Sequence, residues 1–198
     1  MLLAASPGGF GPEHLPAVKD ADDPLVDAAP LVPGLIVRLA YATPQNIAGR
    51  ALYPPDAKCL LRRSVAERLA RAARALAASG LRLVARDCTR TREAHDALWK
   101  AHPVPGAVAD PLRGSLHLRG VAVDVGLARA DGSPADEPTA FDAFGPAAAA
   151  DAKLEGPALR NRQALERAMR EAGFRVNPKE WWHYSRLYGW RWPEAQGH

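Results

Sequence analysis

Residues 115–124 read Ser-Leu-His-Leu-Arg-Gly-Val-Ala-Val-Asp, and this stretch combines a strand pattern with two candidate metal ligands. Three valines alternate as they do in a β-strand: Val121, Val123 and Val125. Asp124 would point to the opposite face of that strand. His117 stands seven residues before Asp124, so a regular strand would place their side chains on opposite faces. Gly120 can adopt backbone angles that other residues avoid, and we expect a break in register there if both residues bind one metal ion.

A second segment, Glu180-Trp-Trp-His183, holds another carboxylate and another imidazole. Together with His117 and Asp124, His183 would complete a set of three protein ligands that suits zinc and leaves a position open for water. Glu180 is then placed to take the proton of that water. A single His or Asp of this kind is more often a buried polar group with a structural partner, and it is the combination of the four residues that favours a metal site. Glu180 and His183 would not share a face of a regular strand, so we expect a bend or loop between them.

The rest of the chain alternates short strand patterns with helical ones. Residues 62–79 have the clearest helical spacing, with Ser64 and Glu67 as a candidate capping box and Gly80 as the stop. Further helices are expected at residues 91–99 and 157–172, and strands at 35–41, 81–87 and 174–176. The strands are short and the linkers between strands and helices vary too much for a doubly wound sheet, so we predict an α+β fold.

Length and composition are those of a globular chain. The 198 residues suit one domain, and the hydrophobic and charged fractions are 47% and 24%. We expect an extended N-terminal arm at residues 1–33, rich in Pro and Gly, and a single domain at 34–198. The net charge of +4 comes from scattered arginines, which predicts no nucleic-acid partner. No apolar run approaches the roughly 20 residues of a membrane span, so no membrane partner is expected.

The two cysteines, Cys59 and Cys88, lack the spacing of a zinc finger. They are either buried thiols or a disulfide, and the sequence leaves both open. Met1 begins a segment without a basic region and too short for a secretory signal. The compartment therefore stays open: a cytoplasmic protein if no signal was present, or a periplasmic one if a signal was removed and the two cysteines are bridged.

The pattern S-x-H-x-x-G-x-A-x-D at 115–124 and the E-W-W-H at 180–183 resemble the zinc D-alanyl-D-alanine dipeptidases of the vancomycin-resistance type. Other stretches extend the likeness over about residues 35–192: Tyr41-Ala-Thr43 with Asn46 and Gly49, Tyr53, Leu60–Arg63, and Phe141-Asp142-x-Phe144. The resemblance implies a small, mostly antiparallel sheet flanked by helices, with the zinc site at the sheet, as in hedgehog-like domains. It also implies hydrolysis of D-Ala-D-Ala to two D-alanines.

The resemblance implies a role for each site residue. The ligands of one zinc ion per subunit would be His117, Asp124 and His183. Glu180 would act as general base, and later as the acid that protonates the leaving amine. Arg90 would stabilise the oxyanion, and Ser115 and Asp142 would hold the free ammonium of a small D,D-dipeptide. The oligomeric state is left open.

One segment departs from the pattern of that family. Where the family has D-x-Y-R-P, this chain has Asp87-Cys-Thr-Arg90-Thr91, so Arg86 and Arg92 are considered as substitutes for Arg90. Two other functions are compatible with the residues: a D,D-carboxypeptidase or endopeptidase acting on peptidoglycan stem peptides, and a non-catalytic zinc-bearing binding module. Glu180 favours hydrolysis, because a structural zinc is normally closed by a fourth protein ligand.

Overall fold

The computed structural model describes residues 15–102 and 108–195, in which strands and helices alternate along the chain. The elements are β1 (Leu25–Asp27), β2 (Ile36–Val37), β3 (Leu60–Arg62), α1 (Arg63–Ala77), β4 (Leu81–Asp87), α2 (Arg92–Ala101), β5 (Ala122–Arg129), α3 (Gly156–Glu171), β6 (Phe174–Asn177) and β7 (Glu180–Arg186). A five-stranded sheet has the order β2-β4-β5-β7-β6, and β1 pairs with β3 in a second sheet. Only β2 and β4 run parallel among the described pairs. The predicted α+β fold with a small, mostly antiparallel sheet is confirmed.

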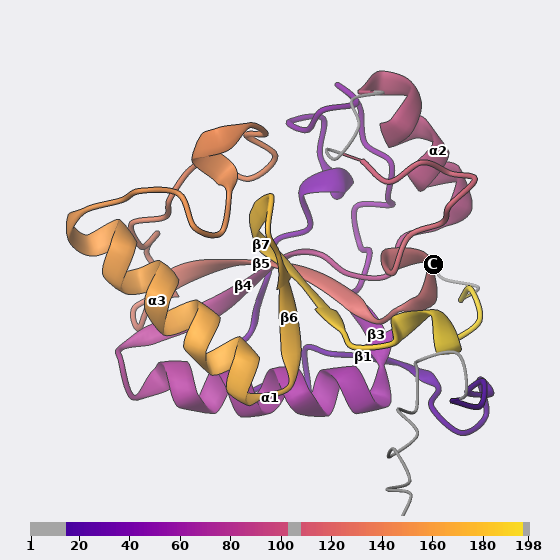
Figure 1. Ribbon diagram of the computed structural model, residues 1–198, viewed down its shortest axis with the longest axis horizontal. Helices are drawn as coiled ribbons and strands as arrows, with labels where there is room; N and C mark the ends of the chain where they lie inside the picture. Colours follow the sequence, from indigo (N-terminus) through magenta and orange to yellow (C-terminus); the bar gives the residue numbers. More distant parts are fainter. Residues whose placement is uncertain (1–14, 103–107, 196–198) are drawn as a thin grey trace, which may run out of the picture.

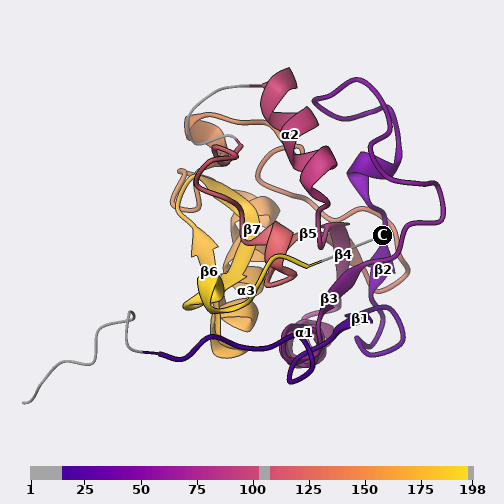
Figure 2. The ribbon, with the colours of Figure 1, turned by 90° about the vertical axis from the view of Figure 1, so that its right-hand side faces the viewer.

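Two helices cover one face of the five-stranded sheet (Figure 1). The apolar stripe of α1 is buried as its three-and-four spacing predicts: Val65, Leu69, Ala72, Ala73 and Leu76. α1 packs on β4, α3 packs on β6, and the two helices contact each other. Figure 2, turned by 90°, places α2 on the other side of the sheet from α1, as Figure 1 does. The opposite face of the sheet is therefore left to loops and α2.

The start of α1 is capped from outside the helix. The capping box expected at Ser64 and Glu67 is wrong, because no side chain at the helix start accepts a capping hydrogen bond. Asp23 does so instead: its carboxylate accepts from the Ser64 backbone N–H at 2.8 Å and from the Ser64 hydroxyl at 2.6 Å. Trp192 Nε1 donates to the same carboxylate at 2.8 Å. Asp23 thus joins the N-terminal segment, α1 and the C-terminal tail.

Much of the segment expected as an arm packs on the body of the protein. Residues 1–14 lie outside the described residues, whereas β1 pairs with β3 and both Ala28 and Val32 are buried. The strand expected at residues 35–41 is shorter, since β2 is followed by a 3-10 turn at Ala40–Ala42 that buries Tyr41. None of the described helices has both the length and the apolar character needed to cross a membrane.

Candidate metal centre and active site

His117 lies in a 3-10 turn, His117–Arg119, just before β5. Gly120 ends this turn with a φ of 69°, in the left-handed region, and its N–H donates to the His117 carbonyl at 3.1 Å. A Cβ at Gly120 would also lie 2.6 Å from Leu25 Cδ2. The backbone angle therefore favours glycine, and a larger residue would also have to displace the Leu25 side chain. The break in register expected between His117 and Asp124 is confirmed at this residue.

Asp124 and His183 meet across two neighbouring strands. They stand directly opposite each other in the antiparallel pair of β5 and β7. Residues opposite each other on adjacent strands have side chains on the same face, so the pairing alone brings these two together. Val123 and Val125 point into the apolar core, which leaves Asp124 on the other face.

Of the bend or loop expected between Glu180 and His183, the loop is wrong, because both residues belong to strand β7, which is irregular between them. The irregularity lies in its pairing with β6: Val176 stands opposite Tyr184, but the next residue, Asn177, stands opposite Glu180. This bulge changes the alternation of side chains along β7. As a result, Glu180 and His183 line the same cavity.

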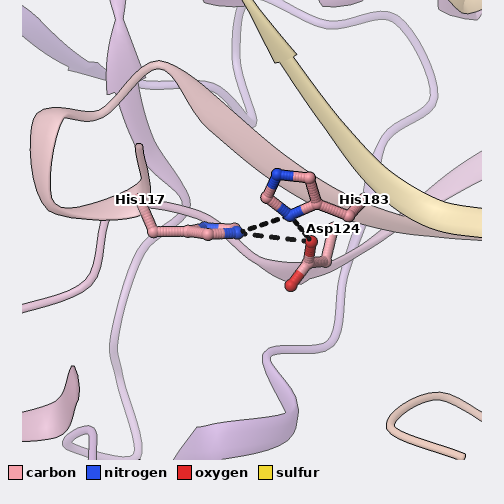
Figure 3. A group of neighbouring side chains, drawn as sticks. All are labelled: His117, Asp124 and His183. Atoms are coloured by element: carbon pink, nitrogen blue, oxygen red, sulfur yellow. Dashed lines mark hydrogen bonds and ion pairs between the residues drawn. The ribbon is translucent and has the colours of Figure 1, made fainter. Parts of the chain in front are cut away.

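The three candidate ligands point toward one another (Figure 3). His117 Nε2 lies 3.1 Å from His183 Nδ1 and 3.3 Å from Asp124 Oδ1, and His183 Nδ1 lies 2.9 Å from Asp124 Oδ1. Ligands about 2.0–2.1 Å from a tetrahedral zinc stand roughly 3.3 Å apart, which is close to these distances. His117 Nδ1 lies 2.7 Å from the Cys88 carbonyl, which can only accept, so Nδ1 carries the proton and Nε2 is free for a metal. These residues could therefore hold a divalent cation.

A cavity of about 570 Å³ opens beside this group, and every sequence-predicted site residue lines it. Glu180 is one of them, and Asn177 Nδ2 donates to its carboxylate at 2.8 Å. Burial raises the pKa of Glu180 to about 7; His183 opposes this rise and the charge of Asp124 adds to it. A carboxyl group near neutrality beside a metal site is suited to proton transfer.

Arg90 reaches the cavity and is held by a buried acid. Its Nε and Nη2 donate to Asp87 Oδ2 at 3.1 and 2.6 Å, and its guanidinium lies 5.3 Å from the centre of the Tyr41 ring. Burial opposes the charge of Arg90, but Asp87 outweighs it, and the pKa lies well above its usual value. The two arginines that could have replaced Arg90 form ion pairs elsewhere: Arg86 with Glu137 and Arg92 with Glu194. Of these three arginines, Arg90 is the one that lines the cavity.

Asp142 lies on the cavity wall together with Ser115. Tyr41 donates its hydroxyl to the two carboxylate oxygens of Asp142 at 3.3 and 3.1 Å. Burial raises the pKa of Asp142 to about 7, and the charge of Asp124 adds to this effect. Ser115 Oγ accepts from the His117 backbone N–H at 3.3 Å. An anion at Asp142 would be stabilised by a cationic group entering the cavity.

Three residues of the site were not singled out from the sequence as site residues: Tyr41, Asp87 and Asn177. Asp87 is buried and also accepts from Tyr53 at 2.6 Å. Asn177 stands three residues before Glu180 across a turn, a spacing that could have indicated the contact. Tyr41 comes from a distant segment, and no local pattern places its hydroxyl beside Asp142.

Comparison with known proteins agrees with this geometry. The chain matches the family described as D-ala-D-ala dipeptidase over residues 21–189. It is similar to a D-alanyl-D-alanine dipeptidase of Escherichia coli (strain K12), with 38% identity over 161 residues, which cover 81% of this chain and 83% of the relative.

Proposed function

Because this chain belongs to the D-Ala-D-Ala dipeptidase family, we propose that it hydrolyses the dipeptide D-Ala-D-Ala to two D-alanines with the help of a bound metal ion. The observation that carries the proposal is the close approach of the three donor atoms of His117, Asp124 and His183, 2.9–3.3 Å apart, in one cavity with Glu180. A buried carboxyl group with a pKa near 7 beside the candidate ligands is suited to proton transfer, which favours catalysis over a binding module.

We infer that the metal is one zinc ion per subunit. Two imidazoles and one carboxylate are a donor set that zinc favours. Across the described parts of the chain, these three residues form the one group of His, Cys, Asp and Glu with such spacing. A zinc ion held by these three residues would have one coordination position left for water or substrate, as in catalytic zinc sites.

In the proposed mechanism, Glu180 takes a proton from the attacking water and then delivers it to the nitrogen of the leaving D-alanine. A zinc ion held by His117, Asp124 and His183 would polarise the scissile carbonyl as a Lewis acid and lower the pKa of water toward neutrality. Arg90 donates to the oxygen that becomes negative when the water adds to the carbonyl. Because Asp87 already orients its guanidinium, little reorganisation is needed, and loss of one such donor typically reduces the rate ~10²–10³-fold.

We propose that Asp142 and Ser115 hold the free ammonium of the dipeptide. Tyr41 keeps the Asp142 carboxylate in place, and the ammonium would lower the pKa of Asp142 so that the acid is charged when substrate is bound. A site that requires this charge discriminates against peptides whose amine is acylated, because the carboxylate is then left without a partner.

The experiment is an assay of zinc-loaded protein with D-Ala-D-Ala, L-Ala-L-Ala and N-acetyl-D-Ala-D-Ala. We expect release of D-alanine from the free D,D-dipeptide, with at least a 100-fold lower kcat/KM for the acetylated one. Turnover of the acetylated or longer peptides alone would instead indicate a D,D-carboxypeptidase or endopeptidase. Zinc binding without turnover of any peptide would indicate a binding module. The Glu180→Ala variant should keep zinc and lose turnover.

We further propose that the protein works in an oxidising compartment such as the periplasm. The support is the disulfide between Cys59 and Cys88, a bond that is rare in reducing compartments. Because both cysteines are buried, native cells are lysed directly into denaturant with the alkylating reagent and without reductant, and neither cysteine should be labelled. Labelling of both would contradict the proposed location.

A further inference from the structure

We propose that the Cys59–Cys88 disulfide positions two parts of the site at once, the metal ligand His117 and the cationic Arg90. The bond joins the residue just before β3 to the residue just after β4, and both cysteines are buried. The effect on turnover presupposes the proposed function, whereas the effect on metal affinity does not.

Cys88 contacts His117 directly through its backbone. Its carbonyl accepts from His117 Nδ1 at 2.7 Å, and two residues later the Arg90 N–H donates to the His117 carbonyl at 3.1 Å. The first bond sets which ring nitrogen carries the proton and how the ring is turned toward Asp124 and His183. A shift of Cys88 would therefore turn the ring or withdraw its hydrogen-bond acceptor.

The residues beside Cys88 hold the guanidinium. Asp87 precedes it and accepts from Arg90 Nε and Nη2, while Tyr53 donates to the other oxygen of Asp87. Asp87 and Arg90 are both buried, so neither has water to replace a lost partner. The segment Asp87–Arg90 thus supports the zinc ligand on one side and the oxyanion donor on the other.

This segment has little support from the sheet. The pairing of β4 with β5 becomes irregular between Ala85 and Asp87, where β4 ends. Beyond that point, the Thr89 N–H and hydroxyl both donate to the Leu60 carbonyl, and the disulfide reaches Cys59, the neighbour of Leu60. The Thr89 hydrogen bonds and the disulfide therefore both tie this segment to Cys59 and Leu60. The residue after Arg90 is Thr91, so the backbone lacks the restraint that proline would give there.

A disulfide can also stabilise a protein only by restricting its unfolded chain, whatever it lies beside. The two roles differ in what happens to the folded protein. A purely stabilising bond can be removed without changing metal affinity below the melting temperature. A positioning bond cannot, because the ligand and the guanidinium lose their alignment in the folded state.

The test compares the double variant Cys59→Ala, Cys88→Ala with the wild-type protein at a temperature where both are folded. Zinc affinity is measured by competition with a chromophoric chelator, and kcat and KM with D-Ala-D-Ala. We expect about 10–100-fold weaker zinc binding, as for the loss of other groups that orient a ligand. We also expect kcat to fall at saturating zinc by more than KM rises.

The matched control is Leu165→Ala, which removes a buried core side chain of α3. It should lower the melting temperature and leave zinc affinity unchanged. Wild-type protein reduced with a phosphine gives a second measurement if the double variant does not fold. Zinc affinity and kcat equal to wild type in the disulfide-free protein, with only a lower melting temperature, would overturn the positioning role. Weaker zinc binding supports it even if no peptide is hydrolysed by any form.

Discussion

Glu180 and Asp142 are two acids whose charge is opposed by burial. The pKa of each is raised to about 7, first by burial and then also by the charge of Asp124. Both groups face a cavity in which a cation is expected, a metal ion near one and an ammonium near the other. A cation stabilises the charged form of a carboxyl group, so both acids should ionise more readily when the metal ion and the substrate ammonium are bound than when they are absent.

This predicts a pH effect on the metal-free protein when Glu180 is replaced by Gln. The folded pKa of Glu180 lies above the ordinary value, so between about pH 4.5 and 7 the folded state keeps a proton that the unfolded state loses. Wild-type stability therefore falls as pH rises through this window, and Glu180→Gln removes the loss. The stability of the variant relative to wild type should rise by ~2 kcal/mol from pH 5 to pH 8.

Urea unfolding of metal-free protein at the two pH values measures this difference. Gln keeps an oxygen that can accept from Asn177, so the hydrogen bond at this place is retained. Glu171→Gln, at an exposed position of α3, is the control and should give no pH-dependent difference. Equal effects of Glu180→Gln at both pH values would contradict the raised pKa.

At the scale of elements, the 3-10 turn at His117–Arg119 and strand β5 are joined by one glycine. Gly120 has a positive φ, and a Cβ added to it would lie close to side-chain atoms of Leu25 and Thr89. The turn before it carries one ligand and the strand after it carries another. The angle between these two elements therefore decides whether the ligands converge.

We predict that Gly120→Ala lowers both stability and zinc affinity, whereas Gly49→Ala lowers only stability. Both glycines have a φ near 65–69°, which disfavours a side chain by about 1 kcal/mol. Only Gly120 also has atoms at 2.6 and 3.0 Å from the added Cβ, while Gly49 has nothing within 4 Å. Thermal melting and chelator competition measure the two effects. Identical behaviour of the two variants would show that crowding at Gly120 is relieved without moving His117.

Helix α1 depends on an acid that lies some forty residues before its start in the chain. Asp23 accepts from the Ser64 N–H and hydroxyl and from Trp192 Nε1. An acid at a helix N-terminus satisfies an unpaired N–H and interacts favourably with the helix dipole. Arg62, the residue just before the helix, makes no capping hydrogen bond with its side chain.

Asp23→Ala is expected to destabilise the protein by about 1–3 kcal/mol, because it removes a cap and leaves Trp192 Nε1 buried without its acceptor. Asp22→Ala, at the neighbouring exposed position, should change stability by less than about 0.5 kcal/mol. Chemical denaturation of both variants makes the comparison. A small effect of Asp23→Ala would mean that another group caps α1.

At the scale of the whole molecule, the candidate metal site connects three parts of the chain: the turn before β5, β5 and β7. Hydrogen bonds between the two imidazoles and the Asp124 carboxylate already hold the three donor atoms close together. A ligand that binds the folded state alone stabilises it by an amount set by its concentration relative to Kd. The metal should therefore contribute to stability as well as to chemistry.

Removal of the metal with a chelator is predicted to lower the Tm by about 10 °C. Free zinc at 1,000 times its Kd contributes about 4 kcal/mol, and each kcal/mol corresponds to roughly 2–4 °C for a chain of this size. His117→Ala should melt at nearly the same temperature with and without chelator. A chelator effect that persists in His117→Ala would place the stabilising metal elsewhere.

Much of the fold could be predicted from local patterns. The spacing of Val65, Leu69 and Leu76 predicts a helix with one buried face, and α1 has it, because a helix buries whichever side its apolar residues share. β2 was expected to be longer, since nothing in Leu35–Tyr41 indicates that the chain turns at Ala40. The capping box failed because Ser64 and Glu67 are a local pattern, while the actual cap comes from Asp23.

The residue types and spacings at His117, Asp124, Glu180 and His183 were enough to predict a metal site and its chemistry, because ligand preference is a property of the side chains themselves. The contacts that orient those side chains were not predictable. They include the Cys88 carbonyl on His117, Tyr41 on Asp142, Asp87 on Arg90 and the bulge that turns Glu180 toward His183. Each depends on segments distant in the chain or on strand register, and those are set by packing of the whole fold.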